Sequence, residues 1–256
     1  FLYRRMSEMG LKTEKHPVVL DGWEFCGATL TYQTEEGERT IRLGGYQTNL
    51  EVKDLKTELV DAGKGTEKDF LKTDVRGKIA LIRINQRDEW WINYPACQAH
   101  LAGAAAVIAV QDKGYGEVDP AALNAQDICG LPNAPAFSMS KSDMAAVLSE
   151  MKKGRLEVVL NAQSKVREKV TTYNIVGMIP GQTSQMIAVS AHYDSYFHGF
   201  EDDNCGVSMM LSLAQALLRS GYKPQKTLVF IAFAAEEWGK INSRYVWSAG
   251  AFAEMT

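Results

Sequence analysis

Two short apolar runs, each followed directly by polar side chains, dominate the last third of the chain. The first covers residues 186–191 and the second covers residues 227–234. Continuous apolar runs of this length are typical of strands buried on both faces. Between them, residues 205–220 carry apolar side chains at every third or fourth position, which predicts an amphipathic helix. A strand, a helix and a second strand in this order predict an α/β fold with an open sheet.

The apolar pattern changes character twice before this region. Residues 1–10 predict a short helix that stops at Gly10, and strand-like stretches follow up to residue 43. Further strand patterns alternate with an alanine-rich helix over 94–105 and a helix that begins at Ser140. Residues 63–77 are predicted to form a polar connector, and residues 163–169 a charged linker. We therefore predict three segments, 1–43, 44–166 and 167–256, in which the middle segment is an inserted domain.

Composition narrows the class of protein. The 256 residues are 46% hydrophobic and 23% charged, which is typical of a globular protein. The formal charge of −3 provides no basic surface, so nucleic acid is not an expected partner. No apolar run is long enough to span a bilayer. The four cysteines lack C-x-x-C spacing, which excludes zinc-ribbon and thioredoxin-like motifs.

Candidate metal ligands follow the predicted strands. His192-Tyr193-Asp194 follows the first run, Asp202-Asp203 precedes the helix, and Glu236-Glu237 follows the second run. Open α/β sheets place their sites at such strand ends. Imidazole and carboxylate groups are zinc ligands where thiolates do not converge, and one carboxylate can bridge two metals. Adjacent glutamates point different ways, so one can bind metal while the other transfers protons. Any one motif alone is typical of an ordinary polar surface, whereas three in this order predict a metal site.

These motifs resemble a known family. His192-x-Asp194-Ser195, Asp202-Asp203-Asn204-x-Gly206 and Glu236-Glu237-x-Gly239 are similar to the motifs of co-catalytic dizinc peptidases, the relatives of glutamate carboxypeptidase and bacterial leucyl aminopeptidases. The resemblance covers residues 170–253. Residues 45–165 resemble a protease-associated (PA) domain through VDAGKGTEKDF, DVRGKIALI and CQAHLAGAAAVIAV. The implied fold is a three-layer α/β/α peptidase domain with a mixed sheet, interrupted by a β-rich PA domain.

The resemblance also implies a role for each candidate residue. His192 would bind one zinc ion, Glu237 the other, and Asp202 would bridge the two. Glu236 would be the general base, and the carboxylate of Asp194 would orient His192. The implied activity is that of a zinc-dependent, aminopeptidase-like exopeptidase that hydrolyses peptide substrates with a metal-activated water.

The family pattern needs one more Asp and one more His from later in the sequence. The chain ends at Thr256 before either, and of its remaining histidines only His198 lies near the motifs. We therefore expect an incomplete chain that is inactive alone. The alternatives are a non-catalytic PA-domain binding module, a single-zinc glutaminyl-cyclase-like acyltransferase, and a structural α/β protein. The sequence makes no prediction about compartment or oligomeric state.

Overall fold

The computed structural model describes residues 1–114, 119–123, 134–196, 198–238 and 247–256. These residues form two compact units. The unit that carries the candidate ligands, here called the site unit, contains the described residues of 1–21 and 168–256, and the insert unit contains those of 22–167. No helix among the described residues has the length and apolar character needed to cross a membrane.

The units meet at Asp21/Gly22 and at Arg167/Glu168, whereas the sequence placed the boundaries after residues 43 and 166. The reason lies in one long strand, β1 (Lys12–Thr34), which passes from the site unit into the insert unit. Its second half pairs antiparallel with β2 (Gly37–Gly45), with Ala28 opposite Leu43. This hairpin places residues 22–43 with the insert.

The insert unit is an α/β unit with a mixed sheet. Its further elements are β3 (Leu50–Asp61), α2 (Glu67–Lys72), β4 (Ile79–Asn85), α3 (Asn93–Leu101), β5 (Ala106–Lys113), β6 (Ala136–Ser138), α4 (Lys141–Met151) and the first part of β7 (Leu156–Ile179). Strands β3, β4, β5 and β6 run parallel, while β2 and β7 pair antiparallel at their two sides. Apolar side chains on opposite faces of β4 and β5 form two cores, one that includes Val147 of α4 and one that includes Ala96 of α3.

One local prediction for this unit was wrong. Residues 163–169 do not form a linker, because β7 runs through them and pairs with β3, with Leu50 opposite Ser164. The polar connector over residues 63–77 contains a short helix, α2. Thr66 begins that helix with a capping box, in which its hydroxyl accepts from the Asp69 N–H and Asp69 binds back to the Thr66 N–H. Local pairing and capping decided both segments.

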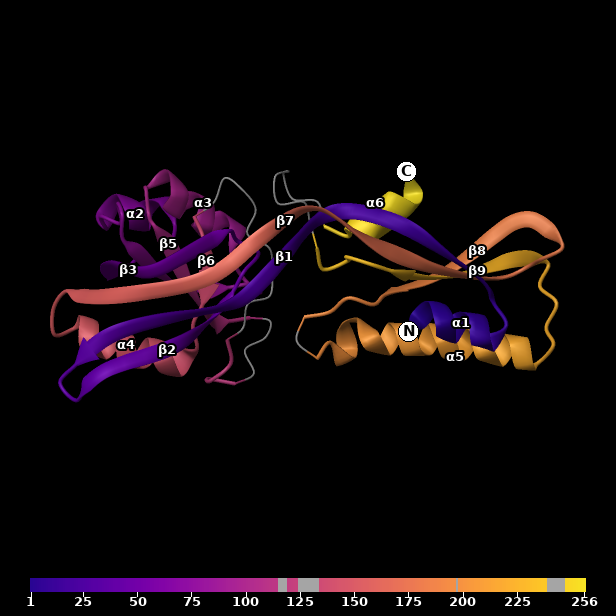
Figure 1. Ribbon diagram of the computed structural model, residues 1–256, viewed down its shortest axis with the longest axis horizontal. Coiled ribbons are helices and arrows are strands. Elements are labelled where there is room, and N and C mark those ends of the chain that lie inside the picture. The colour runs from indigo at the N-terminus through magenta and orange to yellow at the C-terminus, as the bar shows by residue number, and fades with distance from the viewer. Residues whose placement is uncertain (115–118, 124–133, 197, 239–246) are drawn as a thin grey trace. The chain divides into compact units, whose positions relative to one another are not determined.

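The site unit has three layers. Its elements are α1 (Leu2–Met9), the first part of β1, the last part of β7, β8 (Thr183–His192), η1 (Phe200–Cys205), α5 (Gly206–Arg219), β9 (Lys226–Phe233) and α6 (Ala249–Met255). Strand β9 lies between β7, its antiparallel partner, and β8, its parallel partner. Figure 1 shows α1 and α5 against one face of this sheet and α6 toward the other. The predicted mixed α/β fold is therefore confirmed.

Apolar spacing explains how these layers pack. Met6 of α1 and Met210 and Ala214 of α5 pack with Phe230 of β9 in one core. Gly10 ends α1 in a left-handed conformation with φ 98°, which only glycine adopts at no steric cost. The strand, helix and strand predicted over residues 186–234 thus correspond to β8, α5 and β9.

Helix α6 is held against the strands by Asn174. This residue of β7 is fully buried, and its side chain accepts from the Ala234 N–H and donates to the Gly250 carbonyl oxygen. A second donation goes to the Glu254 carboxylate at 2.9 Å. One amide therefore joins α6 to the chain just beyond β9.

We expect Gly250→Ala to displace α6. A Cβ at Gly250 would lie 1.8 Å from the Ala234 carbonyl oxygen, so backbone must move. Overpacking of this kind typically costs ~1–3 kcal/mol, which corresponds to a fall in melting temperature of about 5 °C for a chain of this size. Scanning calorimetry of the variant and of the wild-type protein measures this fall in melting temperature. The exposed change Ala253→Ser on the same helix should shift the melting temperature by less than about 2 °C, and a stabilised Gly250→Ala variant would contradict the packing.

Candidate metal centre

The site forms where the parallel strands β8 and β9 end. Ala191 is opposite Ala232 and His192 is opposite Phe233, so both strands deliver the following residues to the same edge of the sheet. His192 itself is nearly buried. Beyond β9, Ala235 has φ 53°, a left-handed conformation that turns the chain sharply before Glu236. The strand register and this turn bring the glutamate pair alongside the histidine.

Asp194 holds the two strand ends together. One of its carboxylate oxygens accepts the Glu236 N–H at 3.0 Å and the other accepts the Glu237 N–H at 3.1 Å. The imidazole Nδ1 of His192 donates to the backbone carbonyl oxygen of Asp194 at 2.9 Å, while the nearer carboxylate oxygen lies 3.7 Å away. The sequence assigned the orientation of His192 to the Asp194 carboxylate. In the structure the backbone carbonyl makes the shorter contact, and the carboxylate secures the glutamates.

The Asp202-Asp203 pair closes the site from the loop before α5. Neither residue has helical φ and ψ angles, and the peptide bond between them is cis. The Asp202 Oδ1 lies 2.8 Å from the His192 Nε2, whereas the Asp203 carboxylate accepts the backbone N–H groups of His192 and Gly206 at 3.1 Å each. Asp202 thus faces the imidazole, and Asp203 joins the end of β8 to the start of α5.

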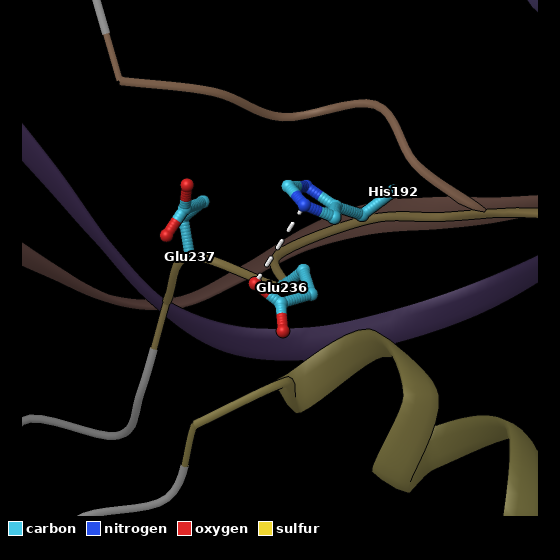
Figure 2. A group of neighbouring side chains, drawn as sticks. All are labelled: His192, Glu236 and Glu237. Carbon is cyan, nitrogen blue, oxygen red and sulfur yellow. Dashed lines mark ion pairs between the residues drawn. The ribbon is translucent and has the colours of Figure 1, made fainter. Parts of the chain in front are cut away.

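His192, Glu236 and Glu237 form a compact cluster. Each offers one ligand atom, and these atoms lie within 4.8 Å of one another. Figure 2 shows the imidazole facing both carboxylates, with the ion pair between His192 Nε2 and Glu236 Oε2 at 3.8 Å. The Glu237 side chain is 8% exposed, and its Oε1 is buried without a hydrogen-bond partner. A buried carboxylate oxygen without a partner is costly in a protein interior unless a cation or a proton satisfies it.

The electrostatics of the cluster reflect this lack of a counter-charge. Burial, together with the negative charges of Asp202 and Glu236, raises the pKa of Glu237 from 4.5 to about 7. Burial lowers the pKa of His192, but the hydrogen bonds to Asp202 and to the Asp194 carbonyl outweigh burial, so the net shift of the pKa is upward. In the metal-free protein both groups therefore retain protons at higher pH than usual.

This donor set fits a metal ion such as zinc. The His192 Nδ1 donates to a carbonyl, which leaves Nε2 directed at the carboxylates, and ligand histidines commonly make such a second hydrogen bond. The Asp202 oxygen and the unpartnered Glu237 oxygen supply negative charge around the same space. A divalent cation at this place would satisfy these groups.

Two other residues near the motifs lie outside this cluster. His198 is exposed and is not among the described residues whose ligand atoms converge, and Cys205 is a free, half-buried thiol at the start of α5. Gly239 of the third motif lies outside the described residues. Sequence reasoning missed Ser248, whose hydroxyl donates to Glu236 Oε1 at 2.8 Å. No local signal marked this serine, because 12 positions separate it from its partner.

Comparisons with known proteins agree with this geometry. Residues 174–254 match the family model for peptidase family M28, and residues 52–147 match the model for the PA domain. The chain is 32% identical over 196 residues to "Aminopeptidase YwaD" of Bacillus subtilis, which aligns 75% of this chain and 39% of that protein. It is 28% identical over 248 residues to "probable leucine aminopeptidase 2" of Aspergillus oryzae, which aligns 96% of this chain and 48% of that protein. The chain therefore spans less than half the length of these two relatives.

One solved structure has a similar fold. The zinc aminopeptidase BSAP from Bacillus subtilis superposes with a TM-score of 0.70 at 29% identity, over 93% of this chain and 55% of that one. The two family matches fall on the two compact units, since the M28 match lies within the site unit and the PA match lies within the insert unit. Residues 52–147 are thus similar to PA domains, and residues 174–254 are similar to peptidase family M28.

Proposed function

We propose that the site unit carries metal-binding and catalytic residues of a zinc-dependent aminopeptidase that acts on peptides. The observation that carries the proposal is the buried, unpartnered Oε1 of Glu237 within the cluster of His192, Glu236 and Glu237. A site of this kind is unfavourable when empty of cations and favourable around one. The match to peptidase family M28 and the aminopeptidase names of the similar proteins support the same chemistry.

Three residues are proposed as metal ligands. His192 would bind one zinc ion, Glu237 a second, and the Asp202 carboxylate would bridge them. Each ion then has two protein ligands, whereas catalytic zinc sites usually have three. One further ligand per ion is therefore required for full activity, and the described residues that converge here do not supply it. We accordingly expect weak metal binding and little turnover from these residues alone.

The remaining residues would manage the proton and the geometry. Bound zinc is a Lewis acid that makes water nucleophilic near neutral pH. Glu236 presents Oε2 toward the His192 side of the site, where it would accept the proton of the attacking water and pass it to the leaving amine. Asp194 would keep both glutamates in place through their backbone N–H groups.

Zinc titration tests the proposal directly. Calorimetry should show zinc binding to the wild-type protein, and His192→Ala should weaken it by ~100-fold or more, because one of few ligands is lost. The matched control is His198→Ala. It changes an exposed histidine in the connection between β8 and α5 and should leave the affinity for zinc unchanged.

Stoichiometry separates the rival functions. Two zinc ions per chain with hydrolysis of leucine p-nitroanilide would support the dizinc aminopeptidase. One ion with glutaminyl cyclisation would support the single-zinc acyltransferase. Because little turnover is expected from these residues alone, absent hydrolysis would not decide between the functions, whereas absent zinc binding would contradict the proposal and favour a PA-domain binding module.

A further inference from the structure

Ser248 contacts the proposed general base at two points. Its hydroxyl donates to Glu236 Oε1 at 2.8 Å, and its backbone N–H donates to the Glu236 carbonyl oxygen at 2.9 Å. The other carboxylate oxygen, Oε2, faces His192 at 3.8 Å. One oxygen of Glu236 is thus held from outside the cluster while the other is directed into it.

The conformation of Ser248 is unusual for its position. It precedes α6, where a serine hydroxyl normally accepts a backbone N–H of the first turn, but it makes no such capping bond. Its φ of 57° and ψ of 46° are left-handed, and such a conformation is strained in a residue other than glycine. The hydroxyl is therefore directed to Glu236 at the expense of a helix cap and of backbone strain.

The surrounding structure holds Ser248 in this place. Helix α6 is joined to the strands through Asn174, which binds both Ala234 and Gly250. Ala234 precedes Glu236 by two residues, and Gly250 follows Ser248 by two residues. The same buried amide therefore fixes the backbone near both members of the Ser248–Glu236 pair.

From these contacts we propose that Ser248 is a positioning residue for Glu236, which aligns Oε2 for proton transfer. The inference rests on the proposed function for its catalytic consequence, whereas the contact itself is independent of metal and substrate. A hydroxyl that restricts a general base to one rotamer reduces the loss of freedom needed to reach the reactive geometry.

Two substitutions separate positioning from folding. Ser248→Gly removes the hydroxyl and also the left-handed strain, so its melting temperature should not fall. Ser248→Asn keeps a donor and tolerates the left-handed conformation. In zinc-loaded protein that supplies the further ligand for each ion, Ser248→Gly should lower kcat by ~10-fold with KM and zinc content unchanged, and Ser248→Asn should restore most of kcat. Ser212→Ala, which removes an exposed helical hydroxyl, is the control and should change nothing.

A measurement without metal tests the contact alone. The ¹³C resonance of the Glu236 side-chain carboxyl, identified by its absence in Glu236→Gln, should shift in Ser248→Gly and move back toward the wild-type position in Ser248→Asn. An unchanged resonance in Ser248→Gly would overturn the inference whatever the enzyme does. Full kcat in Ser248→Gly, or equal losses in both variants, would also overturn it. A shifted resonance in a protein that binds no zinc would instead preserve the contact and refute the proposed function.

Discussion

In protein that supplies the further ligand for each zinc ion, Glu236→Gln is expected to lower kcat by ~10³-fold while the zinc is kept, because a glutamine amide cannot accept the proton of the attacking water. The Glu236 Oε2 lies toward the cluster but is 3.8 Å from the His192 Nε2, and Oε1 is occupied by Ser248. Glutamine has nearly the same shape and can still accept the Ser248 hydroxyl through its oxygen. The loss should therefore fall on kcat rather than on KM or folding.

The measurement pairs steady-state kinetics with elemental analysis of the same samples. Glu201→Gln provides the matched control, since it neutralises an exposed carboxylate of the loop that carries Asp202. It should retain turnover within about twofold, as surface changes away from a site usually do. Turnover of Glu236→Gln at the wild-type level would remove Glu236 from its proposed role.

Glu237→Gln is expected to have opposite effects on the metal-free and zinc-loaded protein. Without metal, burial and the charges of Asp202 and Glu236 raise the pKa of Glu237 from 4.5 to about 7. The folded state then binds more protons than the unfolded state between these two values, so the free energy of unfolding falls as pH rises through that window. Above about pH 7 the full penalty is present, at roughly 3 kcal/mol for a shift of this size.

Glutamine removes this penalty because it does not ionise. The metal-free variant should therefore be more stable than wild type at pH 8 and gain nothing at pH 4. The raised pKa of His192 adds a loss of stability with rising pH in both proteins, since a histidine that gains partners on folding stabilises only while it is protonated. Urea unfolding at a series of pH values checks the difference between the two curves.

Zinc in sufficient excess should reverse the order of stability. A ligand at 1,000 times its dissociation constant stabilises the folded state by about 4.1 kcal/mol per site, and the variant lacks the ligand of one of the two proposed sites. Zinc at pH 8 should therefore raise the melting temperature of wild type by more than that of Glu237→Gln, which keeps the proposed site at His192. If zinc stabilised both proteins equally, Glu237 would not be a ligand.

The C-terminal strands and helices follow from short-range patterns in the sequence. The apolar runs over 186–191 and 227–234 and the periodic helix over 205–220 correspond to β8, β9 and α5. Such patterns are informative because burial against one core imposes its period on each element. The local prediction that failed concerned a polar stretch. The charged residues 163–169 lie within β7, where pairing with β3 outweighs composition.

The sequence alone determined the chemical character of the site. It placed one imidazole and five carboxylates at strand ends and at a helix start. This is sufficient to predict a metal site there, because strand direction and residue type are local properties. The assignment of individual ligands and of Glu236 as base stays a prediction. The experiments above test it.

Only the tertiary structure decided how these residues face one another. Asp194 accepts the N–H groups of Glu236 and Glu237, and Ser248 donates to Glu236, so these contacts join residues 12 to 43 positions apart. The same packing buries a Glu237 oxygen without a hydrogen-bond partner. These contacts depend on the register of β8 against β9 and on the left-handed turns at Ala235 and Ser248. Neither the register nor the turns can be predicted from a local pattern, because each forms only when the chain has packed.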